Sequence, residues 1–70
     1  MRVASIRERP GADSVRVAFL ESARFYDLPR SHPGFEKILA LLREAKERER
    51  TLKVRLPSLD SGLIEDVEAL

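Results

Sequence analysis

The sequence has 70 residues, of which 43% are apolar and 36% charged, so it is too apolar for a disordered chain and long enough for one small domain over residues 1–70. No cysteine is present, which excludes disulfides, thiolate zinc sites and cysteine nucleophiles. Thirteen basic residues nearly balance twelve acidic ones, which argues against strong attraction to nucleic acid or anionic lipid, although four acidic residues lie within the last eleven positions.

The N-terminal residues and the apolar runs bear on the location of the protein. Residues 1–9 carry charges where a secretory signal has an apolar stretch, and no run approaches the roughly 20 apolar residues of a membrane span. Together with the lack of cysteine, these features predict a cytoplasmic protein. The preference for arginine over lysine suggests a bacterial source with a GC-rich genome.

Three extended segments are predicted in the first part of the chain. Residues 3–9 form the weakest of them and end at Pro10-Gly11, a dipeptide favoured at the centre of a type II turn. Residues 14–20 form a stronger strand. Residues 23–28 are extended as far as Pro29, because proline disfavours helix in the residue before it.

The connection between the second and third segments has two interpretations. If residues 21–22 form a tight turn, the register pairs Arg16 with Asp27 and Val17 with Tyr26. Neither turn residue is glycine or asparagine, which are the residues that favour such turns. A single bulged strand from residue 14 to residue 28 is therefore the alternative.

A helix is predicted over about residues 33–49. Pro33 suits its first turn, where the missing N–H costs nothing, and Ser31 or His32 is placed to cap it. Opposite charges lie four residues apart over residues 43–50, which is typical of a solvated helix surface. The apolar residues recur at intervals of three and four on one face, at Phe35, Ile38, Leu39, Leu42 and Ala45.

Two further strands are predicted after the helix. Residues 51–57 alternate apolar and basic side chains with a period of two, which indicates one buried and one solvated face, and Pro57 ends the strand. Residues 58–62 form a turn, and residues 63–70 form a returning strand.

The predicted fold class is α+β, with a small antiparallel sheet, one helix and the element order β-β-β-α-β-β. This order matches a five-stranded OB-like barrel, in which the helix joins the third and fourth strands, and it matches equally well an open sheet with the helix on one face. The OB comparison is a likeness of element order alone. The side chains expected in the core are Val15, Val17, Phe19, Phe25, Phe35, Ile38, Leu39, Leu42, Leu52, Val54, Leu56, Ile64 and Val67.

The densest group of chemically reactive side chains lies over residues 26–34 and includes Asp27, Ser31 and His32, but adjacent residues of one loop rarely reach the geometry of a catalytic triad. His32 and Glu36 share one helix face, yet two ligands are too few for a zinc site. No glycine-rich phosphate loop is present, although an anion could meet the helix N-terminus at Gly34 beside Arg30. The sequence therefore predicts no catalytic residue, no metal and no cofactor.

A nucleic-acid surface is a further hypothesis. Sheet-based binders combine aromatic side chains, on which bases stack, with lysines and arginines along the backbone path. The candidate contacts are Arg24, Tyr26, Lys53 and Arg55, and Tyr26 is the aromatic expected to be partly exposed because its tip is polar. The near-neutral net charge and the acidic C-terminal segment argue against this hypothesis.

For function, the sequence favours a non-enzymatic binding or protein-interaction module. It would dock a protein partner, or a second copy of itself as a homodimer, through a sheet edge at residues 52–56 or 63–70. The alternative is a single-stranded nucleic-acid-binding OB-like domain. An enzyme with its site in the loop of residues 27–32 is the third hypothesis, and it requires a pocket that holds His32. Membrane binding is not expected, because the polar helix face mixes both charge signs.

Overall fold

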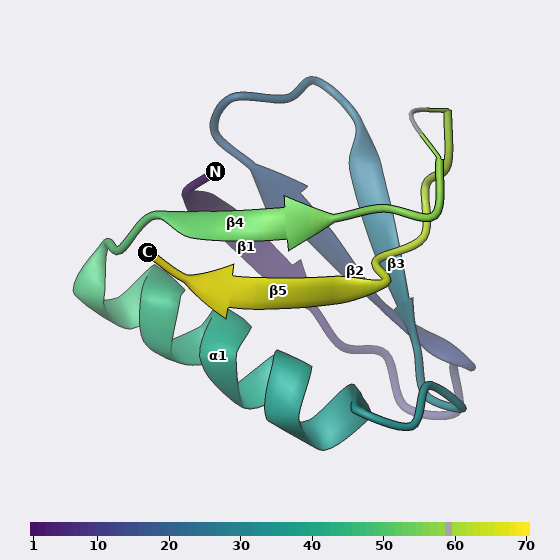
Figure 1. Ribbon diagram of the computed structural model, residues 1–70. Helices are drawn as coiled ribbons and strands as arrows, with labels where there is room; N and C mark the ends of the chain where they lie inside the picture. Colours follow the sequence, from purple (N-terminus) through teal and green to yellow (C-terminus); the bar gives the residue numbers. More distant parts are fainter. Residues whose placement is uncertain (59) are drawn as a thin grey trace.

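The chain forms two antiparallel sheets and one helix, as the computed structural model shows for residues 1–58 and 60–70 (Figure 1). The first sheet has the strand order β1-β2-β3, and the second contains β4 and β5. The elements are β1 (Val3–Arg7), β2 (Ser14–Phe19), β3 (Phe25–Pro29), α1 (Phe35–Arg48), β4 (Leu52–Arg55) and β5 (Asp66–Ala69). The predicted α+β class and the order β-β-β-α-β-β are confirmed.

The register of the first sheet agrees with the tight-turn interpretation. β2 pairs with β3 so that Arg16 lies opposite Asp27 and Val17 lies opposite Tyr26. The two strands are separate elements, joined by the connection at residues 20–24. The alternative of one continuous bulged strand is therefore wrong.

The connection between β1 and β2 contains the predicted turn. Gly11 has a φ of +79°, in the left-handed region that glycine adopts without strain. The Ala12 N–H donates to the Arg9 carbonyl over 3.1 Å, and Pro10 occupies the position before the glycine, as in a type II turn. The turn brings Arg9 and Ala12 to the same end of the first sheet.

β4 and β5 form a hairpin in which basic residues face acidic ones. Lys53 lies opposite Glu68, and Arg55 lies opposite Asp66. Opposite charges directly across an antiparallel pair are favourable, whereas like charges would repel. The basic residues of β4 are thus matched by the acidic C-terminal segment.

The last two strands are shorter than predicted. β4 ends at Arg55 and β5 begins only at Asp66, while Leu63 makes an isolated bridge to the first sheet. The turn predicted over residues 58–62 includes Leu59, which lies outside the described residues.

Two isolated bridges join the sheets. Arg2 pairs antiparallel with Thr51, and Asp27 pairs in parallel with Leu63. Single bridges do not make continuous ladders, so the described residues do not form a closed barrel. The OB-like alternative therefore applies to the order of the elements and not to barrel closure.

Helix α1 lies across one end of the sheets, against β1 and β5 (Figure 1). Its N-cap is Gly34, so Pro33 precedes the helix and neither Ser31 nor His32 occupies the cap, contrary to the prediction. Glu49 ends the helix in the left-handed conformation. The buried face is the predicted one and comprises Ile38, Leu39, Leu42 and Ala45. No helix in the described part of the chain is long and apolar enough to cross a membrane.

The core differs from the prediction on β3. Phe25 is 52% exposed and Tyr26 only 5% exposed, the reverse of what the sequence suggested. Successive residues of a strand face opposite sides of the sheet, and Tyr26 lies opposite the buried Val17. Tyr26 therefore enters the core and Phe25 faces solvent. The buried residues Val3, Tyr26 and Leu28 were not predicted, and Ala45 was placed on the apolar helix face but not in the predicted core. The predicted core residues that are only half-buried are Phe35, Val54 and Leu56.

Leu42 provides a test of this core, because its side chain is fully buried on the inner face of α1. Leu42→Ala should lower the free energy of unfolding by about 2–5 kcal/mol, through lost apolar burial and the cavity left behind. Leu20 is 63% exposed, so Leu20→Ala is the control and should change stability by less than about 0.5 kcal/mol. Urea denaturation followed by circular dichroism measures both. Similar losses in the two variants would contradict the described packing.

Candidate functional site

The outward-facing residues of the first sheet line up across its three strands. The strand register places them in two neighbouring rows, one of Arg7, Arg16 and Asp27 and the other of Ser5, Ala18 and Phe25. The first row is charged, and the second sets one large aromatic ring beside two small side chains. This combination lies on one face because strand residues two apart share a side of the sheet.

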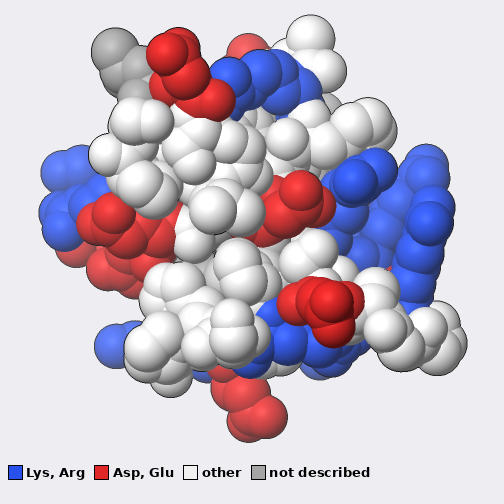
Figure 2. All heavy atoms as spheres, turned by 90° about the vertical axis from the view of Figure 1, so that its right-hand side faces the viewer, with Lys and Arg blue, Asp and Glu red and all other residues white. Residues whose placement is uncertain are grey.

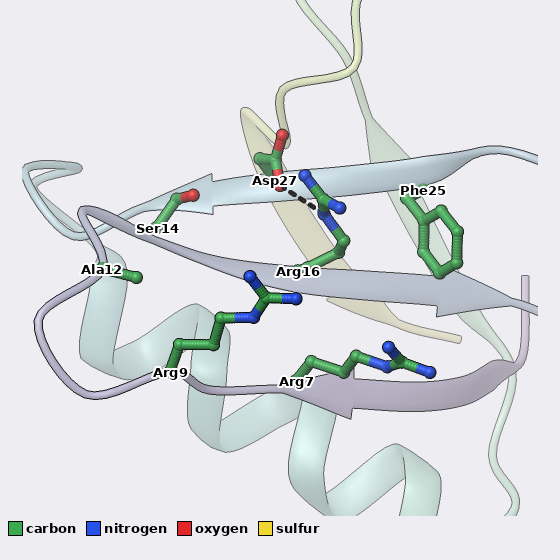
Figure 3. A pocket seen from close by; sticks show the side chains of 7 residues that line it. All are labelled: Arg7, Arg9, Ala12, Ser14, Arg16, Phe25 and Asp27. Atoms are coloured by element: carbon green, nitrogen blue, oxygen red, sulfur yellow. Dashed lines mark hydrogen bonds and ion pairs between the residues drawn. The ribbon is translucent and has the colours of Figure 1, made fainter.

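A shallow hollow of about 200 Å³ lies on this face (Figure 3). Its two sides come from β1 with the following turn and from β2 and β3, and Arg7 and Arg9 lean in the same direction along the first side. The residues that line the hollow are Arg7, Arg9, Ala12, Ser14, Arg16, Phe25 and Asp27. Three guanidinium groups and an exposed aromatic ring therefore share one surface, which we call the arginine face.

Phe25 is the aromatic group of the arginine face. Its neighbours across the strands are Ala18 and then Ser5, which are too small to cover the ring. The guanidinium carbon of Arg16 lies 5.6 Å from the centre of the ring, within the range of a cation–π interaction. An exposed ring beside arginines can stack with a planar ligand.

Arg16 also contacts Asp27, so one guanidinium group serves two neighbours. Its Nε lies 3.4 Å from Oδ1 of Asp27, directly across the two strands. Both side chains are well exposed, at 54% for Arg16 and 37% for Asp27. An ion pair with this exposure contributes at most about 1 kcal/mol to stability, so it can be exchanged for another partner at low cost.

Glu8 and Glu21 have partners outside the arginine face. Glu8 lies between Arg7 and Arg9 in the sequence, but its carboxylate pairs with Arg43 of α1. The carboxylate of Glu21 accepts a hydrogen bond from the Arg2 backbone N–H over 2.8 Å, and this bond lowers its pKa. Among the described residues that line the hollow, Asp27 is the one carboxylate.

The charges of the molecule are unevenly distributed. In Figure 2, lysine and arginine atoms gather along the right-hand side, which corresponds to the back of Figure 1, where the first sheet lies. The predicted contacts Lys53 and Arg55 lie on β4 instead, in the hairpin whose other strand supplies Glu68 and Asp66. The structure therefore does not unite these two residues with the arginine face.

The other two predicted nucleic-acid contacts, Arg24 and Tyr26, do lie together, but Tyr26 is buried. The Arg24 guanidinium lies 5.0 Å from the centre of the Tyr26 ring and donates to the Ser61 carbonyl over 2.7 Å. The Tyr26 hydroxyl is 3.2 Å from the Ser22 hydroxyl. This hydrogen bond lowers the pKa of Tyr26, burial opposes the shift, and Arg24 lowers the pKa further.

The predicted anion contacts Arg30 and Gly34 already have partners within the chain. The Nε of Arg30 donates to the Ala12 carbonyl over 2.7 Å, and the Gly34 N–H donates to Nδ1 of His32 over 2.9 Å. The other ring nitrogen of His32 lies 2.6 Å from the Glu65 carbonyl. Because Nδ1 accepts a hydrogen bond, the ring proton lies on Nε2, which donates to the Glu65 carbonyl. His32 therefore joins the start of α1 to the segment before β5.

The described residues contain no group of three or more histidine, aspartate or glutamate side chains arranged to hold a metal ion.

Comparison with known proteins gives no match: no family model fits the sequence, and neither a curated protein nor a solved structure is significantly similar to the chain. The site must therefore be interpreted from its geometry. The predicted contacts did not include Arg7, Arg9, Arg16 and Phe25, which line the hollow. The signal was present in the register of β2 and β3, because an inward Val17 requires an inward Tyr26 and hence an outward Phe25.

The titration of Tyr26 tests the contacts around it. Ser22→Ala and Arg24→Ala should each raise the pKa of Tyr26, because each removes a group that favours the phenolate. The protein has one tyrosine and no tryptophan, so ultraviolet absorbance reports this residue alone. Arg50→Ala, at an exposed site after α1, is the control and should leave the titration unchanged.

The sign of the pH effect on stability follows from the same shift. The pKa of Tyr26 is lower in the folded state than its ordinary value of 10.0, so ionisation adds stability that is complete above that value. This contribution is lost as the pH falls through the folded-state pKa. If Tyr26 titrates at the same pH in Ser22→Ala, in Arg24→Ala, in the Arg50→Ala control and in the unchanged protein, Ser22 and Arg24 are not the cause of its lowered pKa.

Proposed function

We propose that the protein is a non-enzymatic binding module that holds single-stranded nucleic acid on the arginine face. The observation that carries this proposal is the hollow, which is lined by three arginines and by the exposed ring of Phe25. Proteins that bind single strands combine a basic groove, which follows the phosphates, with aromatic side chains on which bases stack. Unpaired bases are available for such stacking, whereas paired bases in a duplex are not.

The distribution of charge supports the proposal despite the small net charge of +1. The acidic residues of β5 lie opposite the basic residues of β4, and Glu8 pairs with Arg43. The hollow itself is lined by three arginines, Arg7, Arg9 and Arg16, and by one carboxylate, that of Asp27, so this face of the first sheet keeps an excess of positive charge. The net charge of the chain therefore underestimates the attraction of this face for phosphates.

The location on the sheet also supports the proposal. OB-folds bind oligonucleotides on the face of their second and third strands and at the adjoining loops. The arginine face includes the corresponding elements here, namely β2, β3 and the turn after β1, and it extends to Arg7 at the end of β1. This likeness concerns the placement of elements, and the chemistry of the side chains provides the main argument.

Phe25 gives the first test of the proposal. A labelled mixed-sequence single strand of about 16 nucleotides should bind, and Phe25→Ala should weaken binding by about 1–3 kcal/mol, which is roughly 5- to 150-fold. Leu70→Ala removes another exposed apolar side chain, at the C-terminus, and should leave the affinity unchanged. Fluorescence anisotropy measures the affinity, and circular dichroism checks that each variant is folded. Equal affinities of Phe25→Ala and the unchanged protein would exclude stacking on this ring.

Arginine substitutions locate the binding face. Arg7→Ala should weaken binding and reduce the slope of log affinity against log salt by about 0.7, the value for one phosphate contact on a single strand. Arg55→Ala makes the same charge change on β4 and should have a smaller effect, because Arg55 lies opposite Asp66. Equal losses in the two variants would point to attraction without a defined site.

Light scattering distinguishes the competing proposal of a protein-interaction module. A monomer that gains mass with the oligonucleotide, and loses it as the salt concentration rises, supports nucleic-acid binding. A dimer that is insensitive to salt and to the oligonucleotide would instead favour self-association through a sheet edge.

A further inference from the structure

Asp27 is an unusual residue to find on a surface that is proposed to bind phosphates. It is the one carboxylate among the described residues that line the hollow, and it lies in the same row as Arg7 and Arg16. A carboxylate repels phosphate groups and also competes with them for guanidinium groups. Its presence must therefore change how the arginine face binds.

The backbone of Asp27 is held by two hydrogen bonds on the side of β3 that faces away from β2. Its N–H donates to the Gly62 carbonyl over 2.6 Å, and its carbonyl accepts from the Ile64 N–H over 2.9 Å. On the other side, Asp27 lies opposite Arg16 of β2. These bonds do not involve the side chain, so the carboxylate is presented from a fixed position.

Arg16 lies between Asp27 and Phe25 and contacts both. Its Nε is 3.4 Å from the Asp27 carboxylate, and its guanidinium carbon is 5.6 Å from the centre of the Phe25 ring (Figure 3). In this position its charge is partly neutralised, and its guanidinium group occupies space beside the ring. A base that stacks on Phe25 would bring a phosphate close to the same guanidinium group.

We propose that Asp27 is an internal competitor for the phosphate, so that binding transfers the Arg16 guanidinium from the Asp27 carboxylate to the nucleic-acid backbone. This inference rests on the proposed function. The transfer requires a ligand that offers a phosphate and an unpaired base together, because only such a ligand replaces both contacts of Arg16. Asp27 thereby lowers the affinity for isolated anions and sets the selectivity of the face.

The competition is expected to be moderate in size. The Arg16–Asp27 pair is exposed, and exposed ion pairs are weak, so a strand with several phosphates can displace the carboxylate. Asp27→Asn removes the charge and keeps the shape of the side chain. It should tighten oligonucleotide binding by about fivefold and steepen the salt dependence by about 0.7, because Arg16 then gains a full phosphate contact.

Glu68→Gln is the matched control, because it removes one negative charge from β5, opposite Lys53. Binding of the mixed-sequence single strand is measured by anisotropy for both variants, and again in an Arg16→Ala background. The inference expects Asp27→Asn to bind more tightly than Glu68→Gln, and most of this gain to disappear when Arg16 is absent. Asp27→Ser serves as a second variant, and denaturation checks that each protein is folded.

Two outcomes would overturn the inference alone. If the unchanged protein binds but Asp27→Asn binds no better than Glu68→Gln, Asp27 does not compete. If the gain is equally large without Arg16, Asp27 acts through general repulsion and not by holding that guanidinium group. If neither the unchanged protein nor Asp27→Asn binds the oligonucleotide at low salt, the proposed function fails and this inference fails with it.

Discussion

The antiparallel register of β2 and β3 is the constraint on which both the core and the arginine face depend. Val17 opposite Tyr26 turns two side chains inward, and Arg16 opposite Asp27 turns the next pair outward. A shift by one residue would exchange the two sides of a strand and place charges in the core. The same pairing therefore fixes the hydrophobic packing and the group of side chains that can meet a ligand.

Much of the fold was predictable because local signals agreed with the tertiary structure. The turn at Gly11, the helical spacing of Ile38 and Leu42 and the alternation before Pro57 each identified an element. The start of α1 was not predictable in this way. His32 binds the Gly34 N–H and lies against the Glu65 carbonyl, a contact between residues far apart in the sequence.

The site was predicted less well than the fold, for a physical reason. Residue type alone favoured Phe25 for the core and Tyr26 for the surface, whereas the alternation of the strand imposed the opposite arrangement. Lys53 and Arg55 carry the positive charge expected of a phosphate contact. That they lie opposite acidic residues depends on the register of the β4–β5 hairpin, which residue type alone does not reveal. Net charge does not describe any one face either, because it sums over groups that the fold keeps apart.

Among the described residues, the two sheets are joined by single bridges and not by a continuous ladder. A bridge can separate while the ladders on either side stay intact, so the opening requires only part of the free energy of global unfolding. The Asp27 and Ile64 amides are both hydrogen-bonded across this junction. Their rates of hydrogen exchange then report the separation of the two sheets and not the unfolding of the whole domain. Asp27 belongs to this junction and to the arginine face, so the shape of the hollow is coupled to how firmly the two sheets are joined.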